Sequence, residues 1–349
     1  MDALASSLER SPELFPHSWD VQSDVVTLVR LTRADYERVS FLDERALGPR
    51  TLSRTLPTSE LARAVGESGL EERCHFIFHI GHVGSTLLSR LLGAEGRLFA
   101  LREPAILRTL ARLKTDPAPK GRALSDAEFD ERLALFLKLW SRTFEPEQTA
   151  LIKATSFASE LAPRLLAHPS APKALLLFVS PESYIATILA GSNAREEAKT
   201  LTEGRLKRLN RRVGREAWRL GALSEGEALA ASWSAEMSAL VEAKAAAGAR
   251  AMPLDFDGFL ANPDEHLAKT LRHFDCKTTP KKLAEILGGP LMQRYSKAPE
   301  HAYSPELRRE LLDEARKTHA AEIAKGLAWL ERAANEAPLI ADSLKLAVG

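Results

Sequence analysis

The feature that most constrains this chain is a short apolar run that ends in a glycine-containing turn and leads into a helix. Residues 74–80 (CHFIFHI) are apolar and rich in aromatic side chains, which is typical of a buried strand. Gly81 follows, and leucines then recur at helical spacing at positions 87, 88, 91 and 92. A strand, a turn and a helix in this order predict one unit of a parallel α/β sheet.

The turn itself, GHVGST at residues 81–86, has the chemistry of an anion-binding loop. A helix N-terminus presents unpaired N–H groups and the positive end of the helix dipole. Gly81 and Gly84 would let the backbone come close to a ligand, and Ser85 and Thr86 add hydroxyl donors. Together these features predict a phosphate cradle. The alternative interpretation is a plain glycine turn between a strand and a helix.

This loop departs from the nucleoside-triphosphate motif G-x-x-x-x-G-K-[ST]. In that motif a lysine follows the second glycine and reaches the terminal phosphates. Ser85 stands at that place here, so hydrolysis of ATP or GTP is not expected. A nucleotide whose reactive group lies next to its 5′-phosphate would need only this shorter cradle.

Strands and helices alternate along the rest of the chain. We expect strands at residues 98–101, 150–154, 174–179 and 251–256, and helices at 103–113, 126–143, 156–167 and from 181 onward. The predicted fold class is therefore α/β, with a parallel sheet flanked by helices: a P-loop-containing three-layer sandwich with helical insertions.

The chain divides into an extension and one large domain. Residues 1–70, with helical patterns at 33–39 and 59–65, are interpreted as an N-terminal helical extension, and residues 71–349 as the α/β domain. Within that domain we expect a helical insertion at about 192–248 and one C-terminal helix at about 304–334. The basic stretch at 195–215 is either a solvated helix face or a lid whose arginines face an anionic ligand.

Composition narrows the class of function. Basic and acidic residues nearly balance, 48 against 47, so no long-range attraction draws the chain to nucleic acid or to a membrane surface. The two cysteines, Cys74 and Cys276, favour a reducing compartment. The N-terminal residues lack the apolar run of a secretory signal, and no apolar stretch has the length of a membrane span. We expect a cytoplasmic protein with no nucleic-acid or membrane partner.

Five stretches resemble the sulfotransferase superfamily, whose bacterial members carry a GSTLL form of the 5′-phosphosulfate loop. The likeness runs from about residue 74 to 275 and more loosely to Pro305. The stretches, in chain order, are HIGHVGSTLLSRLL (79–92), LREPAIL (101–107), ALIKATS (150–156), LLLFVSPESYIATIL (175–189) and LDFDGFLANPDEHLAKTLRHF (254–274).

The resemblance implies a donor and a set of binding residues. Such enzymes move a sulfuryl group from 3′-phosphoadenosine 5′-phosphosulfate (PAPS) to an acceptor and release the bisphosphate PAP. By this resemblance, Arg294, Ser296 and Lys297 belong to a late basic loop that closes over the nucleotide, although an exposed basic loop has equal weight. The other implied binding residues are Gly81, His82, Val83, Gly84, Ser85, Thr86, Leu87, Ser180 and Thr187.

Several positions depart from the family pattern. The strand that holds the 3′-phosphate usually carries an arginine where this chain has Val179, and a serine where it has Thr187. Valine cannot hold a phosphate, so Arg195, Arg205 or another arginine would have to take its place. Many members also carry a basic histidine after the active-site lysine, and here the run is Lys153-Ala154-Thr155.

Three residues are the catalytic candidates. Glu103, before Pro104 at a strand-to-helix turn, is the expected base, or else only a partner of the helix dipole. Lys153, at a strand end, would neutralise the transferring group, or else lies in solvent. His82 would donate to the 5′-phosphate, or else is a loop histidine without a ligand. His75 and His79 have no acidic or thiol partner at a recognised spacing, so no metal is expected.

The preferred hypothesis is a PAPS-dependent sulfotransferase that acts on a hydroxyl or amine of a small molecule or a peptide. A non-catalytic nucleotide-binding homologue and, more remotely, a P-loop metabolite kinase are the alternatives. The acceptor and the oligomeric state are not indicated by the sequence.

Overall fold

A parallel sheet of five strands forms the centre of the protein. The computed structural model describes the chain except for residues 1–2, 116–122, 215, 297–303 and 349. The strands run in the order β5-β6-β4-β7-β8, and every neighbouring pair is parallel. This confirms the predicted fold class. Their bounds are β4 (Cys74–His79), β5 (Leu98–Arg102), β6 (Thr149–Lys153), β7 (Ala174–Phe178) and β8 (Ala251–Asp255).

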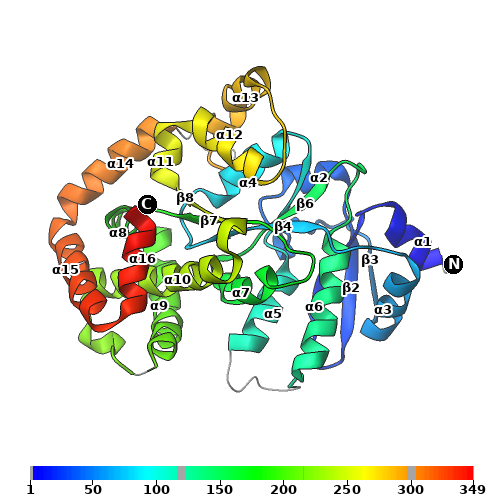
Figure 1. Ribbon diagram of the computed structural model, residues 1–349, viewed down its shortest axis with the longest axis horizontal. Coiled ribbons are helices and arrows are strands. Elements are labelled where there is room, and N and C mark those ends of the chain that lie inside the picture. Colours follow the sequence, from blue (N-terminus) through cyan, green and yellow to red (C-terminus); the bar gives the residue numbers. More distant parts are fainter. Residues whose placement is uncertain (1–2, 116–122, 215, 297–303, 349) are drawn as a thin grey trace.

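Helices cover both faces of this sheet (Figure 1). The α-helices are α1 (Ala3–Arg10), α2 (Arg33–Arg38), α3 (Thr58–Glu67), α4 (Ser85–Ala94), α5 (Ala105–Thr115), α6 (Asp126–Trp140), α7 (Ala162–Leu166), α8 (Pro181–Ala190), α9 (Ser192–Val213), α10 (Glu225–Ala247), α11 (Phe256–Ala261), α12 (Pro263–His273), α13 (Pro280–Leu287), α14 (Pro305–Thr318), α15 (Ala320–Glu336) and α16 (Pro338–Val348). Short 3-10 helices are η1 (Glu44–Ala46), η2 (Ser156–Leu161), η3 (Leu220–Ala222), η4 (Gly248–Arg250) and η5 (Pro290–Gln293).

Burial explains why β4 occupies the middle of the sheet. Phe76, Ile77 and Phe78 are fully buried, as expected for a strand that is covered on both faces. Helix α4 packs on β4, β5 and β6, whereas α10 contacts β4, β7 and β8. The loop after β4 therefore lies between two neighbours, β6 and β7, at the carboxyl edge where open α/β sheets bind ligands.

The N-terminal segment is more than the helical extension that the sequence predicted. Besides α1, α2 and α3 it contains a three-stranded antiparallel sheet of β1 (Leu14–Asp20), β2 (Val25–Arg30) and β3 (Ser53–Pro57). The helical interpretation missed this sheet, although the β-branched run VVTLV at 25–29 was a strand signal. Irregular pairing between Pro16 and Ser18 disturbs the alternation of β1, which hid its pattern.

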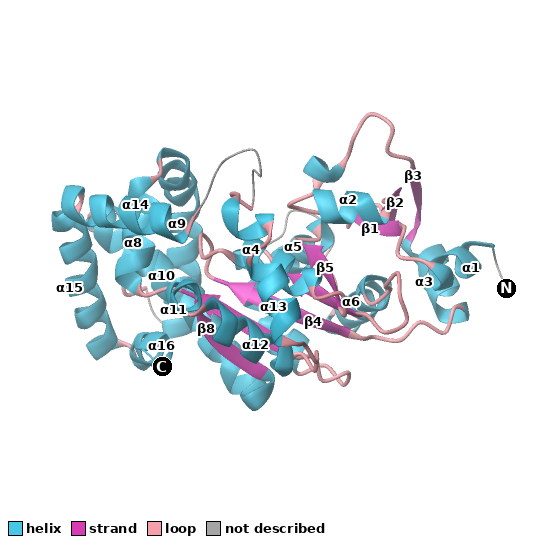
Figure 2. Cartoon of the chain, turned by 90° about the horizontal axis from the view of Figure 1, so that it is seen from above, coloured by secondary structure: helices cyan, strands magenta, loops and turns pink. Residues whose placement is uncertain are grey.

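The C-terminal helix is also not as predicted. The expected single helix at 304–334 is interrupted at His319, whose φ of −113° and ψ of 22° are not helical, so α14 and α15 are separate. Helix α16 follows after Ala337 and was not expected. Residues 192–248, expected as a helical insertion, contain two long helices, α9 and α10. Figures 1 and 2 place the N-terminal sheet and α15 at opposite ends of the molecule.

Among the residues that the structure describes, no helix has the length and apolar character needed to cross a bilayer.

Candidate functional site

A cavity of about 1170 Å³ opens at the carboxyl ends of β4, β5 and β6. Most of the residues that the sequence singled out meet here, although they come from distant parts of the chain. The predicted residues that line it are Gly81, His82, Val83, Gly84, Ser85, Thr86, Leu87, Glu103, Lys153, Thr187 and Ser296.

The loop after β4 has the backbone of an anion-binding turn. Gly81, His82 and Gly84 all adopt positive φ, at 84°, 55° and 67°. Gly84 is the N-cap of α4, and no side chain of the described residues caps that helix. The N–H groups of the first turn of α4 therefore have no side-chain acceptor, and together with the helix dipole they favour an anion.

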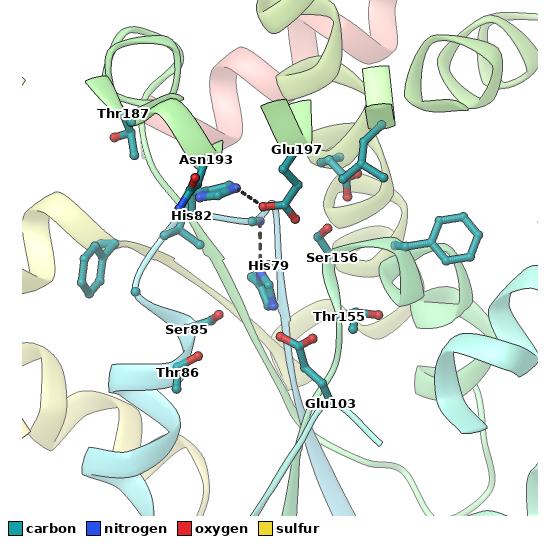
Figure 3. A pocket seen from close by; sticks show the side chains of 18 of the residues that line it. His79, His82, Ser85, Thr86, Glu103, Thr155, Ser156, Thr187, Asn193 and Glu197 are labelled. Atoms are coloured by element: carbon teal, nitrogen blue, oxygen red, sulfur yellow. Dashed lines mark hydrogen bonds and ion pairs between the residues drawn. The ribbon is translucent and has the colours of Figure 1, made fainter. Parts of the chain in front are cut away.

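His79 holds this turn in place. Its Nδ1 accepts a hydrogen bond from the Gly81 N–H at 3.0 Å, and its Nε2 donates to the Ala154 carbonyl at 2.8 Å. These roles require the neutral tautomer with its proton on Nε2. Figure 3 shows His79 directly beneath the loop. The sequence pattern indicates no positioning role for His79, because no local signal marks one.

The first turn of α4 contains a hydroxyl without a partner. Ser85 and Thr86 are 4% and 2% exposed, and Thr86 Oγ1 is buried with no hydrogen-bond partner in the described part of the chain. A buried polar atom without a partner costs free energy, about 1–3 kcal/mol. A buried hydroxyl that faces an uncapped helix end is suited to a ligand with phosphate or sulfate oxygens.

Gly84 is needed for a reason other than the one expected. The sequence predicts that Gly84 allows close approach of a ligand, but a Cβ built there would lie only 2.0 Å from the Phe256 ring. This aromatic ring from α11 occupies the space that a side chain would take. Gly81 is different, because the nearest atoms to its Cβ direction belong to Ser156 and Arg205, at 3.7 and 3.8 Å.

Glu103 and Lys153 form a buried ion pair at the base of the cavity. Lys153 Nζ contacts Glu103 Oε1, with side-chain exposures of 1% for the lysine and 13% for the glutamate. The two residues lie at the ends of the adjacent strands β5 and β6. Lys153 is thus not the solvent-exposed lysine of the alternative interpretation, and Glu103 does more than pair with a helix dipole. In Figure 3 the Glu103 carboxylate points toward the centre of the cavity.

The backbone at Glu103 is strained. Its φ is 54°, in the left-handed region that non-glycine residues rarely adopt, and Pro104 restricts it further. The Glu103 N–H donates to the Lys153 carbonyl at 2.7 Å, which holds the conformation. Strain of this kind, about 1–3 kcal/mol, is concentrated at functional sites.

His82 has a carboxylate partner. Its Nε2 lies 3.2 Å from Glu197 Oε2 on α9, a contact that becomes an ion pair when the imidazole is protonated (Figure 3). Helix α9 therefore contacts the loop after β4 through Glu197. The role of His82 toward a 5′-phosphate remains a prediction.

Two arginines of α9 face the cavity. Arg205 is 4% exposed and donates to Glu236 Oε1 at 2.8 Å, and Arg208 donates to the same oxygen at 3.0 Å. Burial alone would lower the pKa of Arg205, but the nearby Tyr184 and Glu236 outweigh it, so that pKa is raised and the guanidinium stays charged. Arg195 instead pairs with Glu225 and does not line the cavity.

Three further residues that the sequence singled out, Thr187, Ser180 and Val179, have different surroundings. Thr187 lines the cavity and donates to the Ser183 carbonyl at 2.6 Å. Ser180 is the N-cap of α8 and lies outside the lining, so its expected binding role stays a prediction. Val179 is fully buried, and its carbonyl accepts from Trp233 Nε1 at 3.0 Å.

Of the late basic loop predicted at residues 294–297, only part lines the cavity. Ser296 lines the cavity beside Tyr295, and its carbonyl accepts from Ser40 Oγ at 3.1 Å. Arg294 is exposed and not part of the lining, and its predicted role stays a prediction. Lys297 lies outside the described residues.

Several lining residues were not predicted. Arg308 on α14 donates to Asp257 Oδ1 at 2.7 Å, and its guanidinium lies over the Phe256 ring at 5.6 Å. Phe41 and Arg45 come from the N-terminal segment, which the sequence analysis left without a function. Their approach depends on tertiary packing, so no local pattern marks them.

Neither metal nor thiol chemistry has a centre in the described residues. No group of three or more His, Cys, Asp or Glu side chains is placed there to hold a metal ion. Cys74 and Cys276 are both buried free thiols, and burial raises their pKa to about 12 and about 11.

Comparisons with known proteins give sulfotransferases among solved structures. No protein-family model matches the chain, and no curated protein matches it significantly. A sulfotransferase domain from the curacin biosynthetic pathway is 17% identical, with a TM-score of 0.41, and the match covers 70% of this chain and 90% of that one. A sulfotransferase from Mycobacterium avium is 10% identical, with a TM-score of 0.37 and coverages of 73% and 79%. One from Alicyclobacillus acidocaldarius is 14% identical, with a TM-score of 0.37 and coverages of 75% and 95%. These neighbours belong to the superfamily that the sequence motifs resemble, and the likeness concerns the fold.

Proposed function

We propose that this protein transfers a sulfuryl group from PAPS to a hydroxyl or amine of an acceptor. The observation that carries the proposal is the buried Glu103–Lys153 pair, which lines the same cavity as the uncapped first turn of α4. One half of this arrangement provides a carboxylate for proton removal and a fixed positive charge. The other half provides N–H groups for an anionic leaving group. Sulfuryl transfer to a hydroxyl needs all three.

The residues present are suited to the donor. Thr86 Oγ1, buried without a partner, and the free N–H groups beside it are suited to the 5′-phosphosulfate oxygens. Arg205, which lies beside Gly81, adds a buried positive charge there. Thr187 and Arg308, on the packed helices α8 and α14, are polar groups of the lining suited to hold a 3′-phosphate in place of the arginine that Val179 replaces.

Each residue then has a stated task. The donor supplies a sulfuryl group, whose bond to the 5′-phosphate breaks as its bond to the acceptor forms. Glu103 accepts the proton that leaves the acceptor's hydroxyl or amine. Lys153 Nζ offsets negative charge on the transferring group and is held in position by its ion pair with Glu103. The N–H groups of α4 stabilise the phosphate that is left behind.

A non-catalytic nucleotide-binding role is the second candidate, and Val179 favours it. A fully buried valine stands where the resemblance predicts a phosphate-binding arginine. A protein that lost this contact could still hold a nucleotide through the loop after β4 without performing transfer.

Measuring PAP release from PAPS separates the two functions. The wild-type protein is incubated with a panel of phenols, alcohols and amines, beside Glu103→Gln and a surface control, Arg54→Met. The proposal predicts sulfated product from at least one acceptor, and a kcat lower by roughly 10²- to 10⁴-fold in Glu103→Gln without loss of PAP affinity. PAP binding with no transfer to any acceptor would favour the second candidate, and absence of PAP binding would reject both.

A further inference from the structure

The wall of the cavity beside Glu103, where the proposed acceptor would bind, is strongly basic. Arg45 on η1 and two arginines of α5, Arg108 and Arg112, line the cavity together with Glu103 and Lys153. These residues come from the segment before β4 and from the helix after β5. The N-terminal segment thus contributes directly to the site.

Contacts link this basic wall to the reacting pair. The Phe41 ring lies under both Arg45 Cζ, at 3.6 Å from the ring centroid, and Lys153 Nζ, at 5.4 Å. Arg45 Nε donates to Asp43 Oδ1 at 2.9 Å. The pKa of Arg45 is raised, first by this hydrogen bond to Asp43 and in smaller part by the charge of Glu103. Arg45 therefore lies within electrostatic range of the proposed base.

In this basic wall, the charges of Arg108 and Arg112 are not balanced by an ion pair with a described residue. Neither makes a hydrogen bond or an ion pair to any residue that the structure describes, although Arg108 is half-buried and its charge acts on Asp43. Glu103 and Asp43 are already occupied by Lys153 and Arg45. A half-buried guanidinium that faces a cavity without an acceptor is a site for an anion, because its five donors match carboxylate and phosphate oxygens.

We infer that the acceptor is an organic anion. Its hydroxyl or amine reaches Glu103, while a carboxylate, phosphate or sulfate on the same molecule is bound by Arg108, with Arg112 and Arg45 adding positive charge. The inference rests on the proposed function, because it names the class of acceptor for the same site. Neutral acceptors leave Arg108 unpaired, so they bind less tightly.

Matched probes test the anion. Calorimetry in the presence of PAP compares para-hydroxyphenylacetate with its neutral amide, and para-hydroxyphenyl phosphate and sulfate form two further arms that identify the preferred anion. We expect at least one acid to bind roughly 10- to 100-fold more tightly than the amide. Equal affinity of acids and amide, or no binding of any acid at millimolar concentration, would overturn the inference.

Variants identify the residues that hold the charge. Arg108→Met should weaken the acid and leave the amide unchanged, Arg108→Lys should restore part of the preference, and the exposed Arg112→Met should reduce it by a smaller factor. The control Arg54→Met, on β3 outside the cavity, should leave both affinities unchanged. A preference for the acid that survives Arg108→Met would refute the assignment to this arginine.

The same experiments keep this inference apart from the proposed function. A protein that prefers acids through Arg108 but never releases PAP from PAPS retains the anion site and loses the transferase role. A protein that sulfates the amide as fast as the acid retains the transferase role and loses this inference.

Discussion

At the scale of single residues, Glu103 and Lys153 depend on one another. Each side chain is nearly removed from water, so each would be an uncompensated buried charge without its partner. The pair thus joins stability to chemistry at one point of the fold. Its presence was predictable in part, since both residues end strands in sequence, but their contact follows from the pairing of β5 with β6.

A double-mutant cycle tests this dependence. Glu103→Gln leaves Lys153 buried without a countercharge, so we expect the free energy of unfolding to fall by about 3 kcal/mol. Adding Lys153→Met to it should recover part of that loss, because the remaining charge is removed. Urea denaturation measures all four proteins. Additive losses in the double variant would show that the two side chains are not coupled.

Gly84 provides a second prediction at this scale. Gly84→Ala forces a side chain into the left-handed region and into the Phe256 ring, whereas Gly69→Ala, at a nearly identical φ of 65°, meets no atom within 4 Å. We expect a loss of about 1–2 kcal/mol for Gly69→Ala, from backbone strain alone. Gly84→Ala should lose about 1–3 kcal/mol more, because of the clash. Equal melting temperatures for the two variants would contradict the packing of Phe256 against the loop.

At the scale of elements, the first turn of α4 lacks the hydrogen bonds of a side-chain cap, and we expect its N–H groups to bind a ligand instead. Some helices, such as α6 with its Ser125–Glu128 capping box, are capped by side chains, whereas α4, like α9, begins at a glycine with no side-chain cap. A ligand that supplies oxygen atoms would complete this end of the helix.

Thr86→Val tests that exchange. Valine has the shape of threonine but removes the buried hydroxyl that lacks a partner, so we expect unchanged or slightly higher stability together with weaker PAP binding, by roughly 10-fold. The matched control is Thr58→Val, because Thr58 Oγ1 is also buried but donates to the Asp24 carbonyl at 2.9 Å. That variant should lose about 1 kcal/mol and keep its affinity for PAP. A Thr86→Val protein that is destabilised and still binds PAP normally would rule out this role.

Elements with a local pattern were predictable, and those that depend on distant packing were not. The strand-turn-helix unit of β4 and α4 was expected within two residues, since apolar runs and leucine spacing are local signals. The break at His319 was missed because the amphipathic pattern continues across it. The β1–β3 sheet was missed because its first strand is irregular.

At the scale of the whole molecule, the cavity combines distant parts of the chain. Arg45, Glu103, Arg205 and Arg308 are far apart in sequence, and their meeting depends on how the N-terminal segment and helices α9 and α14 pack around the sheet. Sequence motifs identified the loop and, as separate candidates, Glu103 and Lys153. They named Arg205 only as one of several alternatives and did not name Arg45 or Arg308, because a basic residue on a helix has the same local pattern whether it faces solvent or a cavity.

Stability of the whole molecule should decline in mild acid. Burial, and then the charge of Lys173, lowers the pKa of His75 to about 4, whereas an unfolded histidine titrates near about 6.5. As the pH falls through this window the unfolded chain binds a proton that the native protein does not, so the free energy of unfolding decreases. Below both pKa values, the protonation of His75 in the unfolded chain lowers the free energy of unfolding by on the order of 3 kcal/mol.

Urea denaturation between pH 6.5 and 5, above the titration of ordinary carboxylates, checks this expectation. His75→Asn keeps an acceptor near the Lys173 N–H, with which His75 Nδ1 bonds at 3.2 Å, but it cannot titrate. The variant should show a shallower decline in stability than the wild type over this range. An identical decline in both would assign the pH dependence to other groups, such as His17 and His273, whose pKa values are also lowered by burial.

The central claim is that the turn after β4 binds the 5′-phosphate end of a nucleotide. Calorimetric titration of the wild-type protein and of Thr86→Val with PAP tests this most directly. We predict saturable binding by the wild-type protein and an affinity roughly 10-fold weaker in the variant, because a hydroxyl next to the uncapped helix end is lost. No heat of binding with millimolar PAP, or the same affinity in both proteins, would contradict the account.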